Sequence, residues 1–186
     1  MFPGDQPCDF DEIRVVTEQA SGRGVIFLAA ASNSGSLYPD RRVAFPARMY
    51  GHVLSIRSAT GQSERFDASP FPSAGEGLEA ASIEGPPKSN FFSGTSFATP
   101  VAAGVAALVL EFSIQRDGHV PNVDKVTQQN LWSYRGMRKV FRHMCSVSDH
   151  THVNDCDMVV PWQLFDEYNK EDVKIADDIV WLMEKL

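Results

Sequence analysis

The chain has 186 residues, of which 43% are hydrophobic and 22% charged, and its formal net charge is -7. That length and composition suit one globular domain, with room for a short appendage. Because the net charge is negative, the chain offers no basic field to attract phosphate backbones, and nucleic acid is not an expected partner.

Cysteine usage and hydropathy bear on compartment and membrane. Three cysteines (Cys8, Cys145 and Cys156) do not form a disulfide framework, which favours a reducing compartment such as the cytoplasm. The first residues contain neither a basic nor an apolar region, so they do not predict a signal peptide. The most apolar stretch, Phe97 to Leu110, is too short to span a bilayer and contains Pro100, which favours a buried helix and no membrane partner.

The first elements predict half of a β-α-β unit. Residues 8 to 21 place apolar side chains at helical spacing and end in a Ser-Gly-Arg-Gly stop. Val25 to Ala30 is a short, continuous apolar run, typical of a strand buried on both faces of a parallel sheet. Residues 32 to 36 then form a polar loop, the place where open α/β sheets bind ligands.

The middle of the chain continues this α/β pattern. His52 to Ala59 predicts a second strand, and a third is expected around Leu78 to Ile83. Residues 95 to 112 form a long helix crowded with alanine and glycine. The predicted fold class is therefore α/β, a partial doubly wound parallel sheet.

After about residue 114 the pattern becomes helical. Residues 122 to 144 predict one or two amphipathic helices, and residues 163 to 186 predict an acidic one. We therefore expect a first domain over residues 1–113 and a helical C-terminal extension over residues 114–186.

The segment from Ser93 to Pro100 places a serine where a nucleophile would be useful. Gly94 permits a sharp backbone approach just before the helix. Ser96 then lies in the first helical turn, among free backbone N–H groups and at the positive end of the helix dipole. The alternative is a Thr-Ser pair that only caps an alanine-rich helix, and the residues alone do not decide between the two.

Two motifs resemble the subtilisin-like serine proteases (subtilases, peptidase S8 family). Residues 94–100 and 102–108 resemble the family's serine signature, GTS-x-A-[ST]-P ahead of an AG-x-AAL helix, although Ser93 stands where many members have Asn. Residues 25–35 resemble the hydrophobic strand that ends in AAAGN-x-G, with Ser32 in place of the usual glycine. The resemblance extends over residues 8 to 113 and implies the C-terminal part of a catalytic domain.

The resemblance implies peptide-bond hydrolysis through an acyl-enzyme, and we expect no cofactor and no metal among the site residues. Ser96 Oγ would attack the scissile carbonyl, while the Asn33 amide and the Ser96 backbone N–H would hold the oxyanion. Ala30, Ala31 and Ser32 would form part of the wall that receives the primary side chain of a peptide or protein substrate.

The partners of the serine are missing from the expected place. In subtilases the Asp and the His precede the Ser in the chain, yet the 32 residues ahead of Asn33 contain no histidine. The five histidines (His52, His119, His143, His150 and His152) all follow, and none is expected to be the general base. We therefore expect an endopeptidase that is inactive alone and needs a missing N-terminal half as its partner. The alternative is a degenerate protease fold that binds peptides or proteins without catalysis.

A loop rich in histidine and cysteine supports a third interpretation, a metal-binding regulatory tail. It contains His143, Cys145, His150, His152 and Cys156. Their spacing fits no structural zinc pattern, so no metal site is expected.

Overall fold

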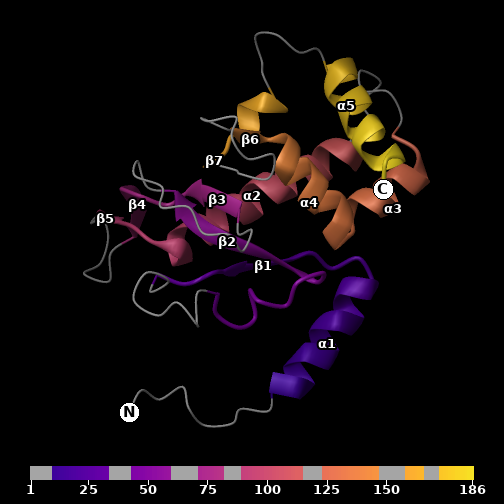
Figure 1. Cartoon of the computed structure of the whole chain (residues 1–186). Helices are drawn as coiled ribbons and strands as arrows, with labels where there is room; N and C mark the ends of the chain where they lie inside the picture. Colours follow the sequence, from indigo (N-terminus) through magenta and orange to yellow (C-terminus); the bar gives the residue numbers. More distant parts are fainter. Residues whose placement is uncertain are drawn as a thin grey trace, which may run out of the picture.

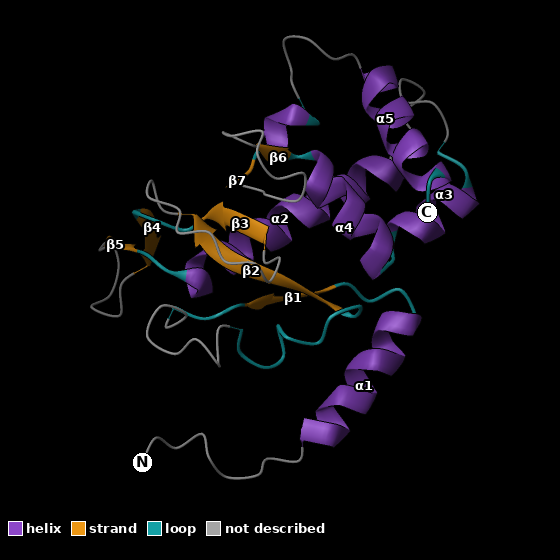
Figure 2. Cartoon of the chain, in the orientation of Figure 1, coloured by secondary structure: helices purple, strands orange, loops and turns teal. Residues whose placement is uncertain are grey.

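A three-stranded parallel sheet lies at the centre of the first half of the chain (Figures 1 and 2). The computed structural model describes residues 10–33, 43–59, 71–81, 89–114, 123–146, 158–165 and 172–186. The sheet has the order β1-β2-β3, and its strands are β1 (Phe27–Ala30), β2 (Val53–Ala59) and β3 (Phe71–Ala74). Both strand pairs are parallel, which confirms the two predicted neighbouring strands and the α/β class.

The helix α2 (Thr95–Ile114) packs against all three strands of this sheet. Its buried face consists largely of alanine and valine and meets Leu54 and Ile56 of β2. Small side chains let the helix approach the sheet closely, which confirms the predicted buried helix. Within the described part of the chain, α2 alone is long and apolar enough to cross a membrane. Its packing on the sheet accounts for the apolar side chains of its buried face.

The third predicted strand belongs to a different sheet. β4 (Leu78–Ala81) pairs antiparallel with β5 (Ser89–Phe92), outside the parallel sheet. The third parallel strand is β3, in a segment where the sequence predicts no helix or strand. Pro72 has no N–H to donate, but it is tolerated because β3 lies at an edge of the sheet.

The helix α1 (Phe10–Gly22) lies at the periphery of the molecule in Figure 1, where the ring of Phe10 lies 4.6 Å from that of Phe45. The helix is confirmed, yet its apolar side chains are exposed, including Ile13 and Val16, which is 64% exposed. β1, whose apolar run is typical of a strand buried on both faces, is half-buried along its length. It lies at the edge of the sheet, and β2 is its one paired neighbour among the described strands.

Helices dominate the second half, as predicted. Two amphipathic helices, α3 (Lys125–Leu131) and α4 (Tyr134–His143), are followed by a hairpin of β6 (Cys145–Ser146) and β7 (Met158–Val159). A 3-10 turn η2 (Pro161–Gln163) and the helix α5 (Asp172–Glu184) complete the order.

Side chains of α3, α4 and α5 share one hydrophobic cluster with α2 and β2. The two sides of the expected domain boundary at residues 113 and 114 are thus joined by packing, and the boundary itself stays a prediction. Cys145 is disulfide-bonded, so the expectation of reduced cysteines is wrong for this one. Its two possible partners, Cys8 and Cys156, both lie outside the described residues.

Candidate active site

The two residues of the predicted site come from elements far apart in the sequence that meet at one edge of the sheet. Asn33 follows the carboxyl end of β1, and Ser96 is the second residue of α2. The carboxyl ends of parallel strands lie at the same edge, and α2 begins there. A hydrogen bond of 2.7 Å from the Gly94 N–H to the Gly75 carbonyl fixes the start of α2 just beyond β3.

The side chain of Asn33 is oriented by the first residue of α2. Its Oδ1 accepts hydrogen bonds from the Thr95 backbone N–H at 2.8 Å and from Thr95 Oγ1 at 3.0 Å. A backbone N–H can only donate, so the amide oxygen must face Thr95 and the Nδ2 group must face away. Thr95 is buried and Asn33 is exposed. The Nδ2 group finds no acceptor among the residues that the structure describes.

The first turn of α2 leaves a second donor free. The N–H groups of Phe97 and Ala98 both donate to the Gly94 carbonyl, at 3.0 and 3.1 Å, and that of Thr95 donates to Asn33. The N–H of Ser96 has no acceptor within the described ranges, and Ser96 is exposed. Two donors near the start of α2, Asn33 Nδ2 and Ser96 N–H, therefore lack an acceptor among the described residues. Such a pair at a helix N-terminus can hold an oxyanion.

Two glycines make this close approach possible. Gly94 has φ of 128°, and a Cβ there would lie 3.0 Å from Asn33 Nδ2. At Gly75 a Cβ would lie 2.6 Å from Ser58 Oγ and 2.7 Å from the Cβ of Ala98. Any larger residue at either position would push the tip of α2 away from the strand ends.

The residues of the predicted substrate wall, Ala30 to Ser32, immediately precede Asn33 in the chain. Ala30 and Ser32 are half-buried, whereas Ala31 is buried and both of its backbone groups are bonded, to the Ile56 carbonyl and the Ala44 N–H. Ala30 and Ser32 are thus the two that present surface. Ser32 has φ of 150°, in the region that favours glycine, at the position where the resemblance expects glycine.

Two residues of this site were not identified from the sequence in the roles they hold. Thr95 orients Asn33 from 62 residues away in the sequence, and no local sequence pattern predicts such a contact. Ser93 Oγ accepts a hydrogen bond of 3.0 Å from the Gly77 N–H, which ties the turn before β4 to the start of α2. For Ser93, its replacement of the Asn found in many family members was the one feature of the sequence that could have drawn attention to this position.

No histidine of the described residues lies at this edge. His52 immediately precedes β2, at the amino end of a parallel strand and thus at the opposite edge, and His143 is the last residue of α4. The other three histidines lie outside the described residues. Those residues also contain no cluster of metal ligands, and the disulfide removes the Cys145 thiolate from the metal-binding interpretation.

Known proteins similar to this chain show the family to which it belongs. The model of the subtilase family (peptidase S8) matches residues 4–129, more than half of the chain. Subtilisin amylosacchariticus of Bacillus subtilis subsp. amylosacchariticus is 32% identical over 111 residues, which are 56% of this chain and 28% of that protein. Alkaline elastase YaB of Bacillus sp. (strain YaB) is 38% identical over 98 residues, 49% of this chain and 24% of that protein.

Solved structures extend the likeness of the fold into the second half. The patellamide maturation protease PatA superposes with a TM-score of 0.56 at 20% identity, over 91% of this chain and 56% of that one. The prenylagaramide maturation protease PagA does so with a TM-score of 0.54 at 20% identity, over 90% and 55%. The chain thus spans about a quarter of the length of the two curated relatives and just over half of these two structures. Its sequence and its fold together place the chain in the subtilase family.

Proposed function

We propose that this chain supplies the nucleophile and the oxyanion hole of a serine endopeptidase. The observation that carries the proposal is the pair of hydrogen bonds from Thr95 to Asn33 Oδ1, at 2.8 and 3.0 Å. They turn Nδ2 away from Thr95, and the next residue, Ser96, has an N–H without an acceptor among the described residues. Donors that are fixed before the reaction lose no energy in reorganisation when charge develops, and this is how such sites accelerate acyl transfer.

The reaction would follow the serine-protease sequence. Ser96 Oγ loses its proton to a histidine and attacks the scissile carbonyl, and the carbonyl oxygen becomes an oxyanion between Asn33 Nδ2 and Ser96 N–H. The leaving amine takes the proton from the histidine, which leaves an acyl-enzyme on Ser96. Water then hydrolyses this ester. Ala30 and Ser32 would flank the side chain of the residue whose carbonyl is attacked.

The histidine and aspartate would come from an N-terminal half of the catalytic domain. Two features support such a partner. Among the described strands β1 is paired on one side only, so its other edge offers backbone N–H and C=O groups to a further strand. The face of α2 that points away from the sheet exposes Val101, Gly104 and Leu108, the last 62% exposed. A helix of this composition packs closely against another element, not against water.

The experiment is complementation. Residues 1–186 are produced alone and together with an N-terminal half that carries the family's Asp and His motifs, and both preparations are assayed for peptide hydrolysis and for labelling by a fluorophosphonate. Alone, the chain should neither hydrolyse nor label, because Ser96 has no base. With the half, both activities should appear and should vanish in Ser96→Ala. The control Ser89→Ala, at an exposed serine of β5, should keep them.

The Asn33→Ala variant separates the two donors. Removal of an oxyanion-hole donor in subtilisin, a member of this family, lowers turnover by about 10²–10³-fold. The same order of loss in turnover, with substrate affinity retained, is expected for the complemented enzyme. A stable complex without Ser96-dependent hydrolysis would contradict the proposal and favour the non-catalytic binding fold. Labelling of the chain alone at Ser96 would contradict the assignment of the base to another half.

A further inference from the structure

The disulfide of Cys145 lies where the helical second half meets the sheet. Cys145 opens β6, the first strand of the hairpin β6–β7. It is half-buried, and it packs against the hydrophobic cluster that α2 and α4 share. The bond therefore ties a position at the core to a second segment of the chain, and its sulfur keeps enough exposure to meet a thiol reagent.

The register of the hairpin brings one of the two other cysteines within reach. Ser146, the neighbour of Cys145, pairs with Met158, and Cys156 precedes Met158 by two residues in the chain. Two residues of chain span at most about 7 Å, and the Cα atoms of a disulfide lie about 4.4–6.8 Å apart. The place of Met158 therefore allows Cys156 to bond to Cys145.

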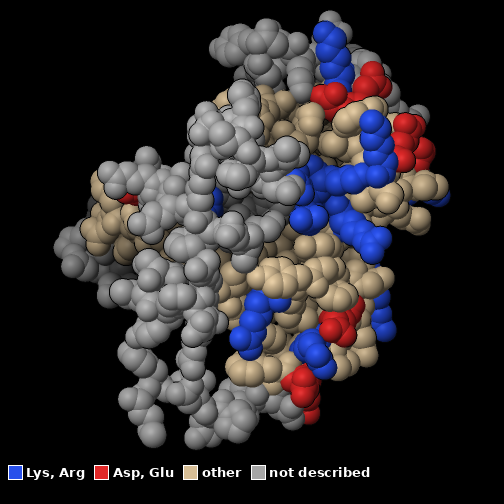
Figure 3. Space-filling model, viewed as in Figure 1, with Lys and Arg blue, Asp and Glu red and all other residues tan. Residues whose placement is uncertain are grey.

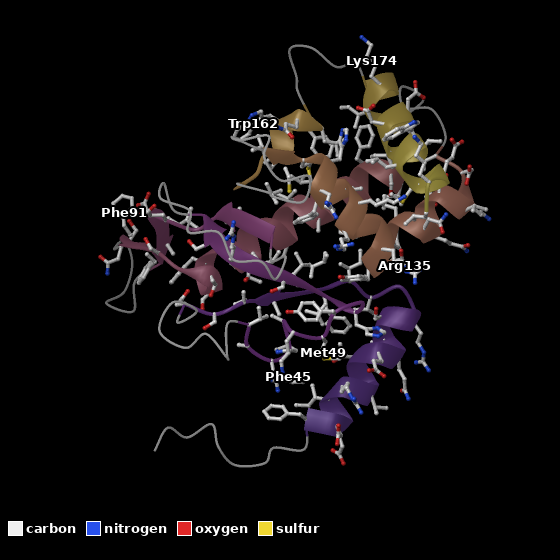
Figure 4. The ribbon with its side chains drawn as sticks, viewed as in Figure 1. Phe45, Met49, Phe91, Arg135, Trp162 and Lys174 are labelled. Atoms are coloured by element: carbon white, nitrogen blue, oxygen red, sulfur yellow. The ribbon has the colours of Figure 1, made fainter. Side chains whose placement is uncertain are left out.

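The remaining cysteine belongs to the opposite edge of the sheet. Cys8 precedes Phe10 by two residues, and the ring of Phe10 lies 4.6 Å from that of Phe45. Figure 4 shows Phe45 beyond the β1 edge of the sheet and Trp162, which follows β7, beyond the β3 edge. Because two residues of chain span at most about 7 Å, Cys8 does not reach across the sheet to the hairpin.

The hairpin covers the outer edge of the parallel sheet. β7 lies beside β3, whose other side is paired with β2 (Figure 2). β3 has four residues, and Pro72 among them has no N–H to donate. β6 and β7 pair through two residues each, and a hairpin of that size is marginal in water without further support. A covalent link across the hairpin therefore strengthens the cover on a weakly held strand.

β3 ends where the candidate active site begins. Its last residue is Ala74, and the carbonyl of the next residue, Gly75, accepts the Gly94 N–H at 2.7 Å. Gly94 immediately precedes α2, which carries Ser96 in its first turn. A displacement of the end of β3 would move this carbonyl, and the start of α2 would lose the bond that fixes it.

We propose that a disulfide between Cys145 and Cys156 is a redox-sensitive clamp that holds the end of β3 and, through it, the first turn of α2. A dithiol reductant breaks the S–S bond, transfers two electrons and two protons to the two sulfurs and becomes a disulfide itself. The hairpin then opens locally and β3 frays with it. The consequence for catalysis rests on the proposed function, whereas the link between the clamp and β3 does not.

Peptide mapping without reductant tests the pairing. Residues 1–186, equilibrated in an oxidising glutathione buffer, should yield a cross-linked peptide that holds Cys145 and Cys156, with Cys8 as the free thiol. Treatment with dithiothreitol should free all three cysteines. A cross-link between Cys8 and Cys145, or three free thiols in the oxidising buffer, would overturn the proposal.

Amide hydrogen exchange measures the clamp on the chain alone. Exchange in the peptide that contains β3, and at Gly94, should be at least tenfold faster in the reduced chain than in the oxidised one. The reference is α1, which lies beyond the other edge of the sheet and carries acidic and basic side chains on its surface (Figure 3). Exchange there should change less than twofold. Unchanged exchange in β3, or equal acceleration in α1, would reject the clamp.

Serine variants separate the clamp from other effects of the reductant. Cys145→Ser should show the fast β3 exchange of the reduced chain with or without dithiothreitol, whereas Cys8→Ser should respond as the wild type does. Because Cys145 packs against the core, Cys156→Ser provides the same comparison if Cys145→Ser does not fold. A Cys8→Ser chain that no longer responds to the reductant would contradict the assignment.

The complemented enzyme tests the step from β3 to the site. Labelling of Ser96 by a fluorophosphonate should slow at least tenfold on reduction and recover on reoxidation. Labelling that ignores the reductant while β3 exchange responds to it would overturn the proposed effect on α2. Absence of labelling in both states would contradict the proposed function instead, and the exchange data on the chain alone would still decide whether the clamp holds β3.

Discussion

At the scale of single residues, the geometry of the candidate site depends on backbone positions more than on the reacting side chains. Gly94 is the clearest case, since its φ is 128° and a Cβ would lie 3.0 Å from Asn33 Nδ2. Gly94→Ala should lower the free energy of unfolding by about 1–3 kcal/mol, the usual cost of a residue forced into such a conformation. Urea denaturation followed by circular dichroism measures this.

The matched control for that substitution lies in the same helix. Gly104 is exposed in the middle of α2, and a Cβ there would meet no atom within 4 Å. Gly104→Ala should therefore raise the free energy of unfolding by about 0.5–1 kcal/mol, because alanine loses less entropy in a helix. If both variants shift stability in the same direction, the account of Gly94 is wrong.

Ser32 allows a second comparison at this scale. Its φ of 150° favours glycine, yet the residue carries a Cβ. Ser32→Gly and Ser32→Ala both remove the hydroxyl, and glycine alone relieves the backbone strain. We expect Ser32→Gly to be more stable than Ser32→Ala by about 1 kcal/mol. This difference is the backbone strain that glycine relieves, minus the entropy that glycine adds to the unfolded chain. In urea denaturation, a Ser32→Ala variant more stable than Ser32→Gly would show that the backbone here carries no appreciable strain.

At the scale of elements, the predictions succeeded where a pattern is long and internally consistent. The apolar run of β1, the periodicity of α3 and α4 and the alanine-rich sequence of α2 each define an element without reference to the rest of the fold. β3 was missed because four residues that include a proline show no period. β4 was found but assigned to the wrong sheet, since pairing is a long-range property that its sequence does not contain.

In the candidate site, too, some features were predictable from the sequence and others were not. Asn33 and Ser96 were found by motif, whereas the role of Thr95 depends on a contact across 62 residues. The disulfide at Cys145 was missed because three cysteines do not make a disulfide framework, although they allow one pair. Local chemistry was thus predictable from the sequence, and the contacts that orient it were not.

The N-cap of α3 gives a pH prediction for one element. The Asp124 carboxylate accepts a hydrogen bond of 2.7 Å from the Thr127 N–H, and this bond holds the pKa of Asp124 below its ordinary value. A carboxyl group whose pKa is lowered by folding stabilises the fold above its unfolded pKa and loses that contribution as pH falls through the folded value.

The variant Asp124→Asn keeps a cap but cannot titrate. The difference in unfolding free energy between wild type and Asp124→Asn should therefore change as pH falls from neutrality to below the ordinary aspartate pKa, with the wild type losing relative stability. Urea denaturation at a series of pH values measures it. A difference independent of pH would show that the carboxylate charge does not stabilise α3.

At the scale of the whole molecule, exposed apolar surface lies on several elements. α1 exposes Ile13 and Val16, β1 has an open edge, and α2 exposes Val101 and Leu108. Periodicity predicted the apolar faces of these helices, but it does not state which element covers a face. A partner half that completes the domain would cover such surfaces, and adjacent positions of α2 can test this.

Leu108 and Val109 are neighbours in the chain, but Leu108 is 62% exposed and Val109 is fully buried. Leu108→Lys should change the free energy of unfolding of residues 1–186 by less than about 0.5 kcal/mol, because water already surrounds that side chain. Val109→Ala should lower it by about 2 kcal/mol, since two methyl groups leave the core and a cavity remains.

In co-purification with the N-terminal half, Leu108→Lys should be the more damaging of the two variants, because the lysine would be buried without a partner in the interface. Leu108→Lys should therefore lose the partner, whereas Val109→Ala, once folded, should retain it. A partner that binds both variants equally well would show that it docks elsewhere than on the exposed face of α2.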